Sequence, residues 1–323
     1  MGSRARTGTD RRRFLRTVAA GAALTAAGGS LDGAAAPGRA TPAQAEPGRA
    51  TPAQTAPGPA VSGARARPPA VRPLFLGTYT SVAGGGTGVG LGTYDTARGR
   101  ITATGVIDGV GDPAYLAFSP CGRTLYTVNE RQQGAVTAVA LRADGRHRVL
   151  GSRPTGGAGP CHLSVHPGGR WLLSANHLSG SVAVHPVDPA RGGALGERTD
   201  LVTHTAPPPG PGQGGPHAHQ IVTSPDGRHV LAVDLGNDTA VVCAYDPATG
   251  TLTPGAPQST GTGPGTSYPA QFLMTRDGAF AYLANRGHNS LTRYAVEAAG
   301  ARGGLRRLGE PFPAPVAVCV LPL

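Results

Sequence analysis

The sequence predicts an all-β protein, a β-propeller of four-stranded blades with about five blades visible, behind an export signal. Glycine (51) and proline (31) make up 82 of 323 residues (51 + 31), whereas aromatic residues are only 5%. Short apolar runs alternate with tight turns, and one turn motif recurs about every fifty residues. Such a composition and spacing favour many short strands arranged as a repeat.

The N-terminal segment has the form of a twin-arginine export signal. Its parts, in order, are Arg11-Arg12, Phe14-Leu15, Arg16 and the weakly apolar stretch 17–29. That stretch is too short to span a bilayer, which needs about 20 helical residues. Small residues suit cleavage after Ala36 or after Ala45. We therefore expect residues 1–45 to be a signal peptide and the protein to be extracellular or in the cell envelope.

A linker follows the signal. The segment PGRATPAQ occurs at 37–44 and again at 47–54, and the Pro/Ala/Gly bias continues through residue 72. Residues of this kind cannot pack a core. The sequence therefore predicts a disordered linker over 46–72 and a propeller domain over 73–323. Later apolar stretches are too short to suggest a stable membrane span.

The positive charge belongs mostly to the leader and linker. Residues 1–72 contain eleven Arg and three acidic residues, a charge of +8, so the remainder carries +3 (11 − 8). A nucleic-acid partner is therefore not expected, because it would require basic residues in the folded part. All 29 basic residues are Arg, which excludes lysine Schiff-base and Walker-type chemistry.

The repeat is anchored on four turns. They are Pro120-Cys121-Gly122-Arg123, Pro167-Gly168-Gly169-Arg170, Pro225-Asp226-Gly227-Arg228 and Arg276-Asp277-Gly278. The glycines 122, 169, 227 and 278 are spaced by 47 (169 − 122), 58 (227 − 169) and 51 (278 − 227) residues. In these turns proline presets φ and glycine accepts a positive φ. Periods of this length indicate propeller blades.

Each repeat unit reads as four strands. In the first complete unit they are PAYLAFSP (113–120), TLYTVNE (124–130), AVTAVAL (135–141) and HRVLGS (147–152). The domain begins with LFLGTYT (74–80), which matches a second strand, and ends with PVAVCVLPL (315–323), which resembles a first strand. Pairing of these two segments would close the ring without an exposed edge.

Neither a cofactor nor a metal site is expected. The four cysteines (Cys121, Cys161, Cys243 and Cys319) lie far apart and lack metal-finger spacing, so most of them read as buried thiols. A metal site between His217 and His219, which share one strand face, stays open as a weaker idea. No acidic or cysteine partner for that pair stands nearby in the sequence.

Three motifs carry a family resemblance. They are GPCHLSVHPGGRWLLSAN, GPHAHQIVTSPDGRHVLAVDLGND and AYLANRGHNSLTRYAV, which occur in order and in register with the blades. The chain resembles the seven-bladed lactonase propellers, the family of bacterial 6-phosphogluconolactonase and fungal carboxymuconate cyclase, over most of 73–297. This resemblance implies a carboxylic-ester hydrolase whose small-molecule partner is a lactone or its hydroxy acid.

The resemblance also implies a set of site residues. The catalytic candidates are His217, His219 and Arg286, and the substrate-binding candidates are His162, Glu130 and His288. An imidazole can activate water or protonate the leaving alkoxide, and a guanidinium can hold a carboxylate or an oxyanion. A structural role remains open for each, and Asn176, Asp234 and Asn285 at equivalent strand ends read as turn caps.

The sequence departs from the family in one region. Family members usually carry, between the HAH and NRG blades, a blade that supplies an Arg and a Glu, whereas residues 263–267 here run directly into the NRG blade. A further blade before the C-terminus is also missing. Export argues against a phosphorylated sugar lactone made inside cells. Two hypotheses remain: a monomeric hydrolase of a sugar lactone or related cyclic ester, and a non-catalytic extracytoplasmic binding or scaffolding module.

Overall fold

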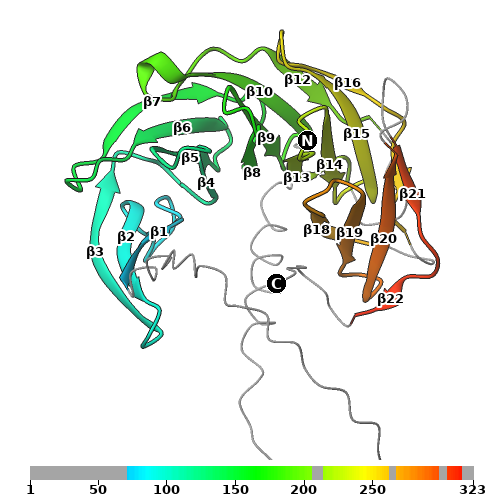
Figure 1. The fold of residues 1–323 in the computed structure, drawn as a ribbon, viewed down its shortest axis with the longest axis horizontal. Coiled ribbons are helices and arrows are strands. Elements are labelled where there is room, and N and C mark those ends of the chain that lie inside the picture. Colours follow the sequence, from blue (N-terminus) through cyan, green and yellow to red (C-terminus); the bar gives the residue numbers. More distant parts are fainter. Residues whose placement is uncertain (1–70, 206–213, 262–266, 298–303, 315–323) are drawn as a thin grey trace, which may run out of the picture. The chain divides into compact units, whose positions relative to one another are not determined.

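The computed structural model describes residues 71–205, 214–261, 267–297 and 304–314, whose regular secondary structure is almost entirely β-strand (Figure 1). These strands form five antiparallel sheets, called sheets 1 to 5 in chain order. Helix in the described ranges is limited to the short 3-10 turn Pro189–Arg191. The predicted signal peptide, most of the linker and the C-terminal strand at 315–323 lie outside the described residues.

The strands follow one another within each sheet. Sheet 1 contains β1 (Val71–Leu76), β2 (Gly88–Asp95) and β3 (Arg100–Asp108). Sheet 2 contains β4 (Leu116–Phe118), β5 (Thr124–Asn129), β6 (Ala135–Ala140) and β7 (Arg148–Pro154). Sheet 3 contains β8 (Pro160–Val165), β9 (Trp171–Asn176), β10 (Ser181–Asp188), β11 (Ala194–Leu195) and β12 (Asp200–Thr203).

The last two sheets repeat this plan. Sheet 4 contains β13 (Ala218–Thr223), β14 (His229–Asp234), β15 (Thr239–Asp246), β16 (Thr251–Pro254) and β17 (Gln258–Ser259). Sheet 5 contains β18 (Pro269–Met274), β19 (Phe280–Asn285), β20 (Ser290–Glu297), β21 (Gly304–Arg307) and β22 (Phe312–Pro313). In sheets 3 to 5 two short strands pair with the third strand and together occupy the fourth-strand position.

Packing between consecutive sheets explains why the second strands have apolar residues at successive positions. On β14, Val230 and Ala232 join a core shared with sheet 3, whereas Leu231 and Val233 join a core shared with sheet 5. Side chains of a strand alternate between its two faces, so a strand covered on both faces must be apolar at successive positions. The first strands β4, β8, β13 and β18 are neighbours in this order. These features confirm the predicted propeller class.

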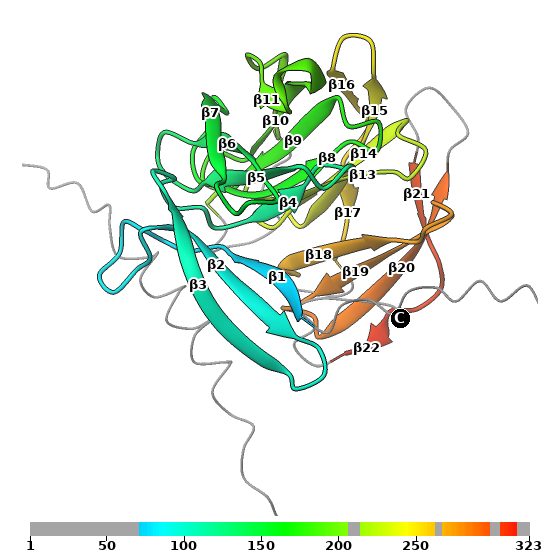
Figure 2. The same ribbon diagram turned by 60° about the vertical axis from the view of Figure 1, so that its left-hand side comes forward.

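Sheet 1 differs from the predicted pattern at its start. β1 begins at Val71, inside the expected linker, and ends at Leu76, short of the predicted Thr80. It ends there because Thr78 N–H donates to the carbonyl of Pro113 (3.0 Å) and Thr80 N–H donates to the carboxylate of Asp112 (2.7 Å), both in the entry to sheet 2. Figure 2 shows the three strands of sheet 1 side by side.

Sheet 5 packs directly on sheet 4. Only residues 260–268 separate β17 from β18, too few for a four-stranded sheet. The Gln220 side chain on β13 bridges the two sheets, accepting from the N–H of Phe272 and donating to its carbonyl (3.1 Å). No further sheet is therefore inserted between sheets 4 and 5, and the sheet with the NRG segment lies next to the HAH sheet.

Candidate functional site

A β-bulge recurs at one position of the first strand in sheets 3, 4 and 5. The strand register shifts between Pro160 and His162, between Ala218 and Gln220, and between Pro269 and Gln271. The bulged residues in the first two of these sheets are Cys161 and His219. Bulges re-aim side chains and are frequent beside active sites. The repeat itself therefore sets the direction of His219.

His217 is fixed by two hydrogen bonds. Its N–H donates to Oδ1 of Asp234 (2.8 Å), and its ring Nδ1 lies 2.8 Å from the carbonyl oxygen of His177. A carbonyl oxygen can only accept, so Nδ1 carries the proton and Nε2 of the neutral ring carries the lone pair. Gly236 leaves room for the ring, because a Cβ there would lie 2.7 Å from Cδ2 of His217.

His177 is a site residue that the sequence analysis missed. Its ring stacks on the ring of His217 with the centroids 4.7 Å apart, and it meets the ring of His219 edge to face at 5.8 Å. The repeat contained a signal for it. His177 stands eight residues after its turn glycine, as do Glu130 and Arg286 in their own sheets.

Asp234 organises the turn that carries His217. The carboxylate is fully buried, and its Oδ2 lies 2.7 Å from Nδ1 of His204. Its Oδ1 also accepts the N–H of Asn237 (2.9 Å). Burial alone would raise the pKa of Asp234, but the bonds from His204 and the backbone outweigh it and lower the pKa. Asp234 is therefore an ionised cap of its turn, as the repeat predicted.

Asn176 and Asn285 also bridge their turns. Nδ2 of Asn176 donates to the hydroxyl of Ser181 (3.0 Å), and Nδ2 of Asn285 donates to the hydroxyl of Thr292 (2.8 Å). In both cases the amide joins the end of one strand to the next strand. These contacts agree with the expected role of the strand-end residues as caps.

Glu130 lies on the sheet 2 side of the same region. Its Oε2 accepts a hydrogen bond from the hydroxyl of Tyr79 (2.7 Å), which comes from the loop after β1. Burial and then the nearby Glu130 charge raise the pKa of Cys161. Sγ of Cys161 in turn donates to the carbonyl of His219 (3.4 Å). The half-buried, protonated thiol of Cys161 therefore lies within the electrostatic influence of Glu130 and is hydrogen-bonded to His219.

His162 is placed as a bridge between sheets. It is buried, and its Nδ1 accepts weakly from the N–H of Ile221 on sheet 4 (3.4 Å). Gln220 at the equivalent position makes the corresponding bond to Phe272 of the next sheet. Burial, and then the neighbouring His219, lower the pKa of His162 to about 3. The ring is therefore neutral at physiological pH, which suits packing better than proton transfer.

Arg286 enters the region from the end of β19. It is half-buried, and its Nε is buried without a hydrogen-bond partner among the described residues. Burial lowers its pKa, and the nearby Tyr268 opposes this effect. The backbone N–H of Arg286 donates to the backbone carbonyl of Tyr268 (3.3 Å). The half-buried His288 lies beside Gly261, near the end of β17.

The turn 234–238 links the two halves of the site. Asp234 at its start holds the N–H of His217, and Asp238 at its end holds the N–H of Tyr268 (2.9 Å). Through these carboxylates the HAH segment and the NRG segment attach to one five-residue turn. The arrangement offers an oriented imidazole and an incompletely paired guanidinium, groups that can act in ester hydrolysis as general base and oxyanion donor.

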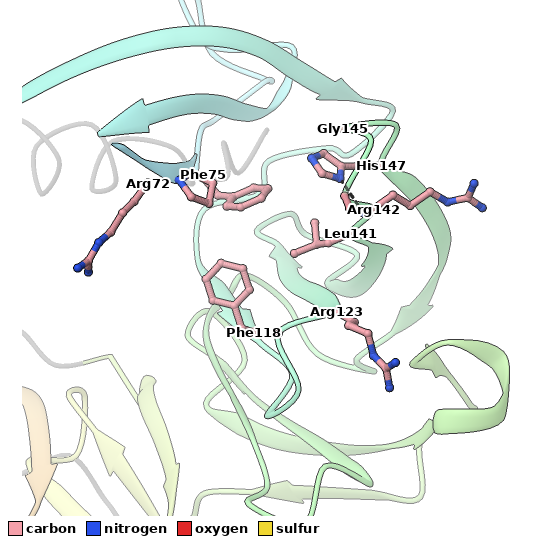
Figure 3. Close-up of a pocket in the computed structure, with 11 residues that line it drawn as sticks. Arg72, Phe75, Phe118, Arg123, Leu141, Arg142, Gly145 and His147 are labelled. Atoms are coloured by element: carbon pink, nitrogen blue, oxygen red, sulfur yellow. Dashed lines mark hydrogen bonds between the residues drawn. The ribbon is translucent and has the colours of Figure 1, made fainter. Parts of the chain in front are cut away.

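Metal-binding geometry is not found in the described ranges, where no three His, Cys, Asp or Glu side chains converge as ligands. A cavity of about 1050 Å³ lies elsewhere, between sheets 1 and 2 (Figure 3). Phe75, Phe118, Leu141 and His147 line it, and the side chains of its arginines extend away from it. None of the predicted site residues lines this cavity.

Comparisons with known proteins agree on one family. The family model described as Lactonase, 7-bladed beta-propeller matches residues 73–266 and 241–306. The 6-phosphogluconolactonase of Bacillus subtilis (strain 168) is 27% identical over 274 residues, which covers 69% of this chain and 77% of that protein. The 6-phosphogluconolactonase of Cronobacter sakazakii is 29% identical over 201 residues, which covers 62% of this chain and 55% of that protein.

Solved structures give the same relationship. The structure of the periplasmic gluconolactonase of Pseudomonas aeruginosa superposes with a TM-score of 0.65 at 30% sequence identity, covering 76% of this chain and 69% of that one. A seven-bladed description contrasts with the five sheets in the described residues.

Proposed function

Because this chain belongs to the lactonase family of seven-bladed β-propellers, we propose that it hydrolyses a sugar lactone or a related cyclic ester to the hydroxy acid. The observation that carries the proposal is the oriented imidazole of His217. Its Nδ1 proton is committed to the carbonyl of His177, which leaves Nε2 to act as a base. His219 on the adjacent bulge is the second candidate for this role.

The reaction can be written with these groups. Nε2 of His217 takes a proton from water as the water oxygen bonds to the lactone carbonyl carbon. The ring C–O bond then breaks, and the imidazolium returns the proton to the departing alkoxide. Arg286 stabilises the negative charge that develops on the carbonyl oxygen, and holds the product carboxylate after the new carboxyl group has released its proton to solvent. The atoms balance with water as the only co-reactant.

An unphosphorylated sugar lactone is the substrate that we favour. Glu130 adds a carboxylate to the site region, which repels a phosphate but accepts hydrogen bonds from sugar hydroxyls. The predicted twin-arginine leader and the periplasmic location of one related gluconolactonase support action outside the cytoplasm, in carbohydrate metabolism. In the described residues no helix is long and apolar enough to cross a membrane. We propose a monomer without a nucleic-acid partner.

A lactone panel tests the proposal. Purified mature protein is assayed on glucono-1,5-lactone and on its 6-phosphate, with uncatalysed opening subtracted. We expect turnover with a preference for the unphosphorylated lactone, and His217→Ala should lower kcat by about 10²- to 10⁴-fold. His147→Ala, at the cavity between sheets 1 and 2, serves as the matched histidine control. Equal rates for wild type and His217→Ala would contradict the assignment of the base.

The alternative is a binding module without catalysis. The reduced number of sheets favours it, since fewer sheets supply fewer residues to the site. In that case gluconate or the lactone would raise the melting temperature without being consumed. Product formation above the uncatalysed rate would exclude this alternative.

A further inference from the structure

Tyr268 has a backbone conformation that its residue type disfavours. Its φ is +49°, in the left-handed region. The other described non-glycine residues with positive φ are Asp112, Asp238 and Asn289, and short polar side chains of this kind tolerate the region. For a bulky aromatic residue the same φ is a genuine outlier. Pro269 follows immediately, and a proline restricts the preceding residue further toward extended conformations.

The repeat explains where this strain comes from. Asp112, Gly159 and Tyr268 each stand eight residues before their turn in sheets 2, 3 and 5, each precedes a proline, and each has a positive φ. The position is therefore left-handed in three sheets, and glycine adopts this conformation without steric cost in sheet 3. In sheet 4 the equivalent residue, His217, is not among the residues with a positive φ. In sheet 5 a tyrosine occupies the position and is strained there, although glycine would adopt the same backbone conformation without strain.

The surrounding contacts hold Tyr268 in this state. The buried carboxylate of Asp238 accepts both the N–H of Ser267 (2.6 Å) and the N–H of Tyr268 (2.9 Å). The carbonyl of Ser267 accepts from Gly287 (2.8 Å), and the carbonyl of Tyr268 accepts from Arg286. Strained backbone that several surrounding contacts hold in place is found most often at functional sites.

The side chain of Tyr268 is exposed, so packing does not explain the tyrosine. The residue keeps 37% of its surface accessible, although its backbone is tied to buried Asp238. It also lies beside Arg286, whose guanidinium has one buried and unpaired N–H among the described residues. An exposed tyrosine beside a half-buried guanidinium with an unpaired Nε–H matches a polyhydroxylated ring that carries a carbonyl or carboxylate.

We propose that Tyr268 is a substrate-binding residue, whose ring and hydroxyl contact the sugar part of the lactone while Arg286 holds its carboxyl end. The inference rests on the proposed function and deepens it. Tyr268 sets the preference for a sugar lactone over a smaller cyclic ester. Its strain is the consequence of placing an aromatic side chain at a position where the backbone favours glycine.

Two substitutions separate binding from strain. Tyr268→Ala removes the ring and keeps the left-handed backbone strained, whereas Tyr268→Gly removes the ring and relieves the strain. Both should raise KM for glucono-1,5-lactone about tenfold, the loss of roughly 1.4 kcal/mol of binding, with little change in kcat. Tyr268→Gly should melt about 2–4 °C higher than Tyr268→Ala. Tyr268→Phe keeps the ring, so its KM should lie between that of the wild type and that of Tyr268→Ala.

Controls keep the result interpretable. Phe280→Ala removes an exposed aromatic residue from the start of β19, at the opposite end of that strand from Arg286, and should leave KM unchanged. Unchanged KM in both Tyr268 variants would overturn this proposal alone. If the wild type opens no lactone, the proposed function fails. Gluconate binding, measured by thermal shift, then tests the role of Tyr268. Binding should weaken in both Tyr268 variants, and unchanged binding would contradict the proposal.

Discussion

Sheet 4 and sheet 1 are built on the same meander but are packed differently. All six residues of β14 in sheet 4 are buried, because sheets 3 and 5 cover its two faces. In sheet 1, eight of the nine residues of β3 are exposed, and the described core contacts come from sheet 2 alone. The turn 234–238, which holds His217 through Asp234, therefore belongs to the more completely buried sheet.

The difference teaches how a propeller supports a site. A side chain keeps a catalytic geometry only when its supporting residues are themselves locked. In sheet 4 the buried Asp234 provides that support, and in sheet 1 the corresponding loop contributes one hydroxyl, that of Tyr79. The sharpest tests of this comparison therefore pair a change in sheet 4 or at its interface with a matched change in sheet 1 or beside it.

The largest effect is expected at Asp234. Asp234→Ala removes the acceptor of His217 and Asn237 and leaves buried His204 without its carboxylate, which should cost about 3–5 kcal/mol of unfolding free energy. It should also lower kcat about 10²-fold by releasing His217. Asp108→Ala in sheet 1, where the exposed carboxylate accepts from the hydroxyl of Thr87, is the control for urea unfolding and kinetics. Equal effects in both variants would show that burial of sheet 4 does not matter.

The next effect concerns acid stability at the interface of sheets 3 and 4. The pKa of His162 is lowered to about 3, so between roughly pH 6.5 and 3 the unfolded chain binds a proton that the folded protein does not. Stability should therefore fall as the pH falls through this window, by up to about 1.4 kcal/mol per pH unit from this residue.

Replacing His162 tests that window. His162→Gln introduces the residue found at the same repeat position in sheets 4 and 5, Gln220 and Gln271, and should flatten the pH dependence. Urea unfolding at pH 6.5, 5.5 and 4.5 measures the slope. His147→Gln, beside Phe75 of sheet 1, should leave the slope as it is. An unchanged slope in His162→Gln would place the acid sensitivity elsewhere.

Much of the fold could be predicted because its information is local. Glycine turns at a regular period mark the blades, and Asn or Asp at strand ends cap turns by contacts within a few residues. The predicted end of β1 was wrong because Asp112, in the loop that leads into sheet 2, accepts the backbone N–H of Thr80. A strand pattern contains no information about such a distant acceptor.

The site was predictable only in part for the same reason. The HAH and NRG motifs indicated His217 and Arg286, yet the proton position on His217 depends on a carbonyl from the neighbouring sheet. His177 was missed although the repeat aligns it with Glu130 and Arg286, because the repeat comparison covered only the strand-end residues one position earlier, Asn176, Asp234 and Asn285. Tyr268 gave no signal, since tyrosine is not a turn residue.

The smallest effect is expected at Tyr79, the contribution of sheet 1 to the site region. Tyr79→Phe removes the hydrogen bond to Oε2 of Glu130 and should cost less than about 1.5 kcal/mol of unfolding free energy. If Glu130 contacts sugar hydroxyls, its looser carboxylate should raise KM for glucono-1,5-lactone about two- to fivefold at constant kcat. Tyr94→Phe on β2, an exposed tyrosine of the same sheet, is the control.

The outcome at Tyr79 decides how far the site extends. A raised KM in Tyr79→Phe alone would mean that a sheet packed mainly on one face still positions a substrate contact through a single charged hydrogen bond. An unchanged KM would contradict that expectation and confine substrate binding to sheets 2 to 5. In that case the loop after β1 would serve only to attach sheet 1 to sheet 2, through Thr80 and the carboxylate of Asp112.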